Sequence, residues 1–149
     1  MMKKLALLLF IVTGINQAQS IDYYTKKGYI AEGYDVVAYF SEKAVKGDSK
    51  FKTVYDGVNY KFSSQENLDI FLKNPVKYVP KYGGYCAYAV AKDGKKVSIN
   101  PKTFEIRNGE LLLFYNSFGI NTLEKWKKEG GEDLYKNAEL KWSKIKNSN

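Results

Sequence analysis

Two dipeptides, Asp56-Gly57 and Asn108-Gly109, constrain the fold of this 149-residue chain most strongly. Each lies between two runs of strand-forming residues, at 51–55 and 58–62 for the first and at 103–107 and 111–115 for the second. Both dipeptides accommodate the positive φ angles of a two-residue turn, so each predicts an antiparallel β-hairpin. Another run of strand formers, at residues 34–40, predicts a further strand.

The segment after the first hairpin carries the start, the buried face and the end of a helix. Ser63-Ser64 offers a capping hydroxyl, and Asn74-Pro75 ends the helical pattern. Between them, Leu68, Phe71 and Leu72 recur at the spacing of one helical face. We therefore expect these three side chains to form a single buried stripe.

Residues 82–94 fit two kinds of secondary structure. Three alanines and the terminal Gly94 favour a short helix that opens near Gly84 and closes at Gly94. The alternation of Tyr85, Ala87 and Ala89 with their neighbours would also suit a strand. The alanine content makes the helix the preferred interpretation.

Two more helical patterns fill the C-terminal region and are separated by Gly130-Gly131. Leu123 and Trp126 share one face of the first helix, and the stripe of the second consists of Leu134, Ala138, Trp142 and Ile145. The order of elements lacks the strand–helix alternation of a parallel sheet. It predicts an α+β fold, a small single domain with two antiparallel hairpins and three to four helices.

The chain contains one cysteine, Cys86, and no histidine. A single thiol cannot form an internal disulfide, so stability must come from packing, for which 13 Tyr, 8 Phe and 2 Trp supply apolar area. A tetrahedral Cys/His zinc site within one chain is excluded. Ser-His-Asp and Cys-His catalysis are excluded as well, because no imidazole is present to act as the base.

The first twenty residues have the pattern of a secretory signal peptide. Lys3-Lys4 precedes the apolar run 5–15, and Ala18 and Ser20 form a small-x-small cleavage site. The apolar run is too short for a membrane span, which needs about 20 residues. We expect residues 1–20 to be a signal peptide and 21–149 to be a periplasmic or extracellular protein without a membrane span.

The net charge of the chain is +8. In a cytoplasmic protein such a charge would suggest nucleic acid as a partner. Because we expect export, we predict no nucleic-acid partner and interpret the lysine clusters of the C-terminal half as solvated faces.

Several motifs in order resemble the exported branch of the YHS-domain family. They are residues 33–40 (Gly-Tyr-Asp-Val-Val-Ala-Tyr-Phe), 60–67, 74–80, 82–87 (Tyr-Gly-Gly-Tyr-Cys-Ala) and 100–101. The resemblance implies a YHS-like domain with a C-terminal helical extension. Some members of this branch carry selenocysteine, which would favour chalcogen chemistry if it falls at position 86.

The resemblance also implies metal handling, with copper as the candidate soft metal. In the thiol-bearing relatives, cysteines occupy positions that correspond by motif order to Ala38, Ser63 and Asn67 here. None of these three residues is a soft ligand, so the inherited metal site is expected to be lost.

Cys86 is the candidate catalytic residue and the candidate ligand of a soft metal. Gly83 and Gly84 would permit close approach of another group, and a helix N-terminus would stabilise a thiolate. Tyr82, Tyr85 and Tyr88 could line a pocket around the sulfur.

Asp35, the last candidate binding residue, is a carboxylate among strand formers. We interpret it as a turn or hydrogen-bond anchor in preference to a general base.

Three functions remain open. The leading hypothesis is a thiol-dependent redox or ligand-binding protein of the cell envelope, centred on Cys86 and working with an envelope redox partner. The second is a copper-binding or chaperone module with a metal-handling partner, which is weakened because the mature chain has no second thiol and no thioether. The third is a structural or interaction domain in which Cys86 is packed in the core.

The signal peptide leads to the first prediction. The exported protein should begin within two residues of Ile21, because cleavage follows the small residues Ala18 and Ser20. Intact mass of the protein from the envelope fraction measures this directly. A soluble cytosolic species that still begins at Met1 would contradict it.

Overall fold

The computed structural model describes residues 19–148, and both predicted hairpins are present in it. Strand β3 (Asp48–Tyr55) pairs antiparallel with β4 (Val58–Phe62), and β5 (Asn100–Arg107) pairs antiparallel with β6 (Glu110–Phe114). Asp56 and Asn108 have φ angles of 49° and 52°, and the glycine after each has a φ of 75°. The expected signal peptide falls almost wholly on residues outside the described part.

Two shorter hairpins were not predicted. Strands β1 (Thr25–Lys26) and β2 (Tyr29–Ile30) are joined by Lys27-Gly28, and β7 (Asn116–Ser117) and β8 (Ile120–Asn121) are joined by Phe118-Gly119. Lys27 and Phe118 have φ angles of 53° and 51°. These turns have the same backbone form as the predicted ones, but lysine and phenylalanine rarely adopt positive φ.

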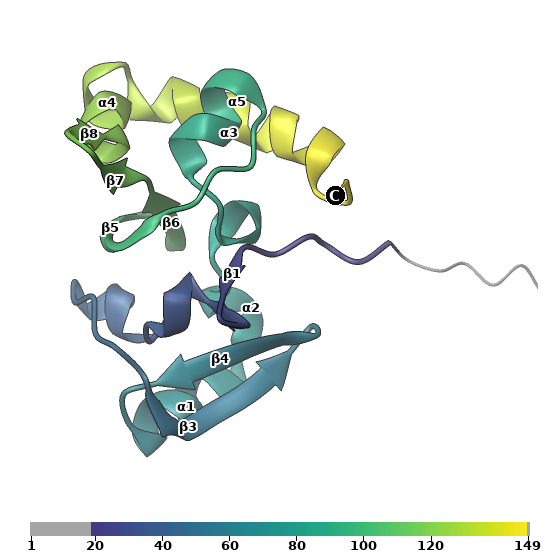
Figure 1. Cartoon of the computed structure of the whole chain (residues 1–149), viewed down its shortest axis with the longest axis vertical. Helices are drawn as coiled ribbons and strands as arrows, with labels where there is room; N and C mark the ends of the chain where they lie inside the picture. Colours follow the sequence, from purple (N-terminus) through teal and green to yellow (C-terminus); the bar gives the residue numbers. More distant parts are fainter. Residues whose placement is uncertain (1–18, 149) are drawn as a thin grey trace, which may run out of the picture.

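The elements form two halves that lie one above the other (Figure 1). The N-terminal half contains a four-stranded sheet in the order β1-β2-β4-β3, and the C-terminal half contains β5 to β8 with three helices. Strand β6 is buried on both faces. Leu111 and Leu113 join the core shared with the N-terminal half, while Leu112 and Phe114 join the core of the C-terminal half. The structure confirms a small α+β domain.

The helix expected after the first hairpin is α1 (Gln65–Lys73). Its N-cap is Ser64, whose hydroxyl accepts the backbone N–H of Asn67 at 3.1 Å. Leu68 and Phe71 are buried, but the prediction for Leu72 is wrong, because 54% of its surface is exposed. The helix packs on the sheet along a narrow stripe, and Leu72 lies at its edge.

Pro75 ends α1 and also begins the short helix α2 (Pro75–Tyr78). Proline is compatible with the first position of a helix because the N–H it lacks has no helical partner there.

The preferred helix in residues 82–94 is present as α3 (Ala87–Asp93). It ends at Gly94, which has a φ of 61°, as expected for a left-handed C-cap. It begins at Ala87, later than expected, because residues 81–84 form a separate irregular turn.

The strand predicted at residues 34–40 is wrong. Only Tyr34 makes an isolated bridge, to Lys46, and residues Ala38–Ser41 form a 3-10 helix. The side chain of Asp35 accepts the backbone N–H groups of Val37 and Ala38 at 2.9 and 3.2 Å, which bends the chain into a turn. The segment is nevertheless buried, so its apolar residues indicated the core correctly and the secondary structure incorrectly.

The C-terminal region contains α4 (Thr122–Lys128) and α5 (Gly131–Ile145), separated at Gly130 as expected. With α2, the described chain has five α-helices, one more than the upper bound of the prediction. In the predicted stripe on α5, Leu134 and Ala138 are buried, and Trp142 and Ile145 are partly buried against the same core. No helix among the described residues is long and apolar enough to cross a bilayer.

The N-terminal segment before β1 crosses Gly83 at very close range. A Cβ atom on Gly83 would lie 2.5 Å from the carbonyl oxygen of Asp22 and 3.0 Å from the ring of Trp142. Tyr24 donates its backbone N–H to the Gly83 carbonyl at 2.9 Å. Gly83 also has a positive φ of 59°, so glycine is required here for two separate reasons.

Gly83→Ala should therefore destabilise the protein more than Gly109→Ala, its matched control. Both glycines have positive φ, but nothing lies within 4 Å of a Cβ atom at Gly109. In the control, backbone strain should lower the free energy of unfolding by about 1 kcal/mol. In Gly83→Ala, overlap of the new Cβ atom with its neighbours should lower it by about 1 to 3 kcal/mol more. Urea unfolding measures both losses. Equal losses would mean that the contact with Asp22 relaxes at no cost.

Candidate functional site

Cys86 lies in the core at the point where α3 begins. Its side chain has no exposed surface, and its backbone N–H donates to the carbonyl of Val97 at 3.0 Å. An isolated parallel bridge joins it to Leu113 of β6. The residue therefore connects the start of α3 to strand β6.

Three groups close a ring of hydrogen bonds around the sulfur. The backbone N–H of Tyr115 donates to Sγ of Cys86 at 3.3 Å, and Sγ lies 3.3 Å from Oγ1 of Thr122. The Thr122 hydroxyl donates its proton to the carbonyl of Tyr115 at 2.7 Å. Since that proton is already used, the thiol must be the donor to Thr122. The sulfur therefore has one hydrogen-bond partner in Tyr115 and another in Thr122.

The three tyrosines expected to line a pocket around the sulfur have other hydrogen-bond partners, and Cys86 itself is fully buried. The hydroxyls of Tyr82, Tyr85 and Tyr88 each donate to a carboxylate, at 2.9 to 3.1 Å. Those carboxylates belong to Glu139, Asp22 and Glu129, so no hydroxyl of the three is directed at the sulfur.

The pKa values of these tyrosines respond to the same surroundings. Burial, followed by the hydrogen bond to Asp22, raises the pKa of Tyr85 to about 12. Burial is also the largest cause that raises the pKa of Tyr82 and of Tyr88, ahead of their glutamate partners. All three therefore stay protonated near neutral pH and act as hydrogen-bond donors.

Gly83 and Gly84, predicted as binding residues, lie against the protein's own N-terminal segment. A Cβ atom on Gly84 would lie 3.1 Å from Cδ1 of Ile30, and Gly83 is covered by Asp22. The predicted close approach of backbone is present, but its partner is another part of the chain.

Asp35 is fully buried and accepts five hydrogen bonds. In addition to Val37 and Ala38, the carboxylate accepts the backbone N–H of Ser63 at 2.8 Å, its hydroxyl at 2.6 Å and the amide of Asn67 at 2.7 Å. The side chain is thus a hydrogen-bond anchor that ties residues 35–38 to the start of α1.

The three positions that the resemblance assigns to cysteine in relatives meet around this carboxylate. Ala38, Ser63 and Asn67 each supply at least one donor to Asp35. A cation there would face N–H groups, whose partial positive charge opposes it, so the residues present do not fit a metal. No cluster of three or more Cys, Asp or Glu among residues 19–148 has metal-ligand geometry.

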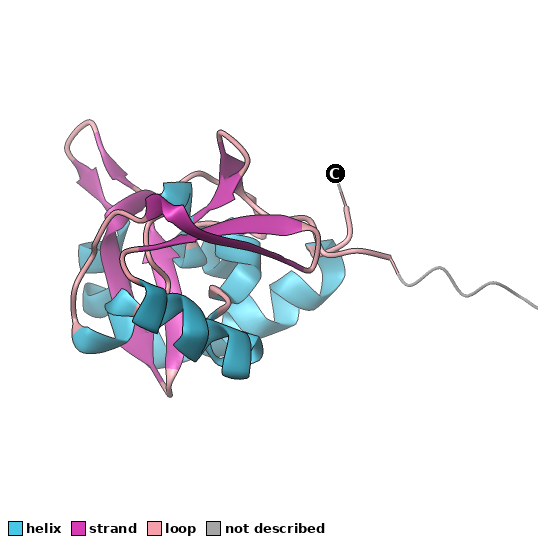
Figure 2. Ribbon diagram, turned by 90° about the horizontal axis from the view of Figure 1, so that it is seen from below, coloured by secondary structure: helices cyan, strands magenta, loops and turns pink. Residues whose placement is uncertain are grey.

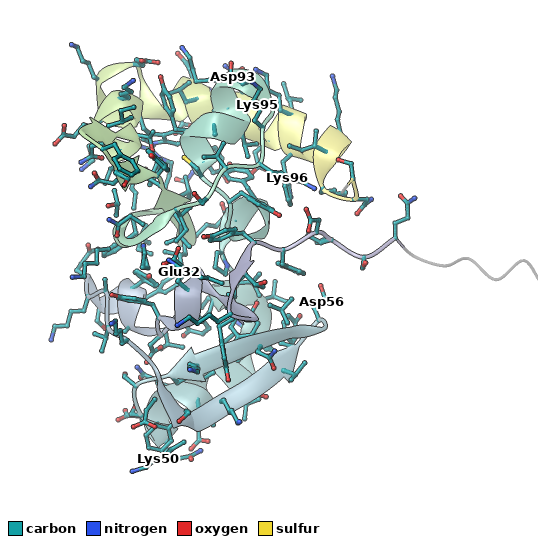
Figure 3. The ribbon with its side chains drawn as sticks, viewed as in Figure 1. Glu32, Lys50, Asp56, Asp93, Lys95 and Lys96 are labelled. Atoms are coloured by element: carbon teal, nitrogen blue, oxygen red, sulfur yellow. The ribbon has the colours of Figure 1, made fainter. Side chains whose placement is uncertain are left out.

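A groove lies elsewhere, where the two halves of the molecule meet. Its volume is about 850 Å³, and its walls include Tyr34, Asn100 and Tyr115. Glu32, which also lines it, is labelled at this junction in Figure 3. Cys86 does not line this groove.

Five lysines line the groove, and Glu32 is the single acidic residue among its lining residues. The lysines are Lys26, Lys27, Lys46, Lys61 and Lys102. Lys26 is paired with Glu32 at 3.2 Å, and Nζ of Lys61 lies 4.1 Å from the centre of the Tyr29 ring. Among the described residues, the other three lysines make no ion pair with a carboxylate, and all three are exposed. The groove is therefore strongly electropositive.

The two unpredicted hairpins flank this groove and project from the same side of the molecule (Figure 2). The β1–β2 hairpin supplies Lys26 and Lys27, and the β7–β8 hairpin supplies Ser117 and Phe118. The sequence did not indicate the groove because its lysines are scattered over residues 26–102 and are brought together by folding alone.

The comparison with protein families gives one result, which lies mainly in the N-terminal half. Residues 36–82 match the YHS domain. The comparisons with curated proteins and with solved structures found no match. The YHS domain, which is associated with metal handling, here comprises β3, β4, α1 and α2. Of the residues that line the groove, only Lys46 and Lys61 lie within this match, and Cys86 lies beyond it.

The geometry at Cys86 generates a prediction about its reactivity. In the native protein, iodoacetamide should alkylate Cys86 roughly 100-fold more slowly than in urea, because access requires an opening of about 3 kcal/mol or more. Mass spectrometry over time measures both rates. The control is a Cys86→Ser, Ser49→Cys variant, whose exposed thiol in β3 should react at similar rates in both conditions. Equal rates for Cys86 would contradict the buried ring.

Proposed function

We propose that this protein is an exported YHS-domain protein of the cell envelope that binds an anionic ligand in the groove between its two halves. The observation that carries the proposal is the lining of that groove, with five lysines and one glutamate. Export is supported by the signal pattern of residues 1–20.

The dimensions of the groove suit a small ligand or part of a larger one. Its volume of about 850 Å³ falls within the range of ligand sites, roughly 300–1,000 Å³. The amide side chains of Asn100 and Asn116 add hydrogen-bond donors to the lysine charges. Asn100 is fixed by its own bond to the Asn116 carbonyl at 3.2 Å, so this wall is ordered before a ligand arrives.

Lys27, Lys46 and Lys102 are the expected primary contacts. They have no acidic partner among the described residues, and their like charges repel one another across the groove. An anion bound between them would remove that repulsion as well as gain attraction. Lys26 contributes less, because Glu32 already neutralises it.

Ligand binding in the groove replaces the sequence hypothesis, whose redox or ligand-binding role was centred on Cys86, because Cys86 does not line the groove. A redox role would require the Cys86 sulfur to leave its hydrogen-bond ring and reach a partner thiol. Copper binding is suggested by the association of the YHS domain with metal handling. It would require a second soft ligand, and none lies beside Cys86 among the described residues.

Titration with inorganic pyrophosphate tests the proposal on the processed protein. Replacing Lys27, Lys46 and Lys102 by Gln should weaken binding roughly tenfold or more, as expected for three lost charge contacts. Isothermal titration calorimetry at low salt measures the affinity.

A matched variant controls for net charge. Lys50, Lys52 and Lys95 are exposed and do not line the groove, and Figure 3 places Lys50 and Lys95 well away from Glu32. Their replacement by Gln should leave the affinity unchanged within about twofold, because screened charges at a distance contribute little. Equal losses in the two variants, or no binding by the unaltered protein, would overturn the proposal.

A further inference from the structure

Phe118, at the tip of the β7–β8 hairpin, is the most exposed large apolar side chain in the described chain. Its exposed fraction is 94%, and its neighbour across the turn, Ile120, is 44% exposed. Phe118 makes no aromatic pair among the residues described. The ring therefore contributes almost nothing to the packing of the fold.

The backbone at this position is unfavourable for phenylalanine. Phe118 has a φ of 51°, which glycine, asparagine and aspartate adopt much more readily. The β5–β6 hairpin shows the alternative, since Asn108 occupies the equivalent position at a φ of 52°. Phe118 thus combines a strained backbone with an exposed ring, and neither feature stabilises the folded state.

The surroundings of Phe118 carry the positive charge described above. It lies at the rim of the groove with Lys102, and Lys27 is the first residue of the turn in the opposite hairpin. Because both hairpins project from the same side (Figure 2), a flat surface could contact both turns together. An apolar tip beside several lysines is the arrangement by which proteins attach to the surface of an anionic bilayer.

We infer that the anion bound by this protein is the phosphate headgroup of an anionic bilayer, with Phe118 inserted at the interface. The inference rests on the proposed function and identifies the anionic ligand of the groove as a lipid headgroup. Lysines near an anionic surface each strengthen binding, and an aromatic ring gains by leaving water for the headgroup region. A soluble anion would use the lysines alone and would leave the Phe118 ring in water.

Co-sedimentation with vesicles tests the inference on the processed protein. The probes are vesicles of phosphatidylcholine alone and of phosphatidylcholine with 30 mol% phosphatidylglycerol, a composition chosen to present a negative surface. The protein should bind only the anionic vesicles. Phe118→Asn should weaken that binding roughly fivefold.

Two variants separate insertion from a general loss of apolar surface or of folding. Phe118→Trp should restore vesicle binding, because tryptophan also favours the interface. Leu140→Asn removes an apolar side chain on α5 that is 68% exposed and lies outside the groove, and it should bind as the unaltered protein does. Phe118→Asn should also raise the urea midpoint, which shows that its weaker binding is not misfolding.

The outcomes distinguish the two proposals. Unchanged vesicle binding by Phe118→Asn, or equal binding to both vesicle types, would overturn the membrane inference. If pyrophosphate binding still depends on the groove lysines in that case, the proposed function stands. Absence of binding to both pyrophosphate and vesicles would overturn both.

Discussion

The buried carboxylate of Asp35 is the interaction on which the N-terminal half depends. It accepts five hydrogen bonds from residues 37–38 and 63–67, which are separated by the whole β3–β4 hairpin. A buried charge without a paired cation is costly unless dipoles compensate it, and five donors supply that compensation. The turn that results directs Val36 and Tyr39 into the core. Tyr39 then donates to the Pro101 carbonyl at 2.6 Å, which links the two halves.

This centre also bears on the relation between the YHS domain and metal. Residues 36–82 match that domain, yet the positions expected to carry thiols hold groups that donate hydrogen bonds. A set of donors can organise an anion, and a set of thiolates can organise a cation. In this chain a negative side chain lies at the middle of the cluster and is surrounded by hydrogen-bond donors.

The sequence predicted the features that depend on a few neighbouring residues. Asp56-Gly57 and Asn108-Gly109 gave the hairpins, Ser64 gave the start of α1 and Gly94 gave the end of α3. It failed where one distant or atypical residue decides the conformation. Residues 34–40 have the composition of a strand, but the Asp35 carboxylate accepts backbone N–H groups within the segment and bends it into a turn. The turn at Phe118 has no signal in its residue type, because phenylalanine rarely takes a positive φ.

The candidate site shows the same limit more strongly. Cys86 stood out by residue type, but its burial and its contacts with Tyr115 and Thr122 were not indicated by the sequence. The groove has no distinctive residue, since lysines are the most ordinary surface side chains. Its character arises from long-range folding, which places two short hairpins on one side of the molecule. Local patterns carry no information about such a juxtaposition.

The contact of the N-terminal segment with the last helix sets an order of events during biosynthesis. Asp22 donates its backbone N–H to the carbonyl of Lys146 at 2.8 Å, and Trp142 of α5 lies over Gly83 beside it. Residue 22 is synthesised long before residue 146, so this bond between the two ends of the chain forms only after α5 has been made. Until then Gly83 lacks the Trp142 ring that lies against it, and the domain is closed last by its final helix.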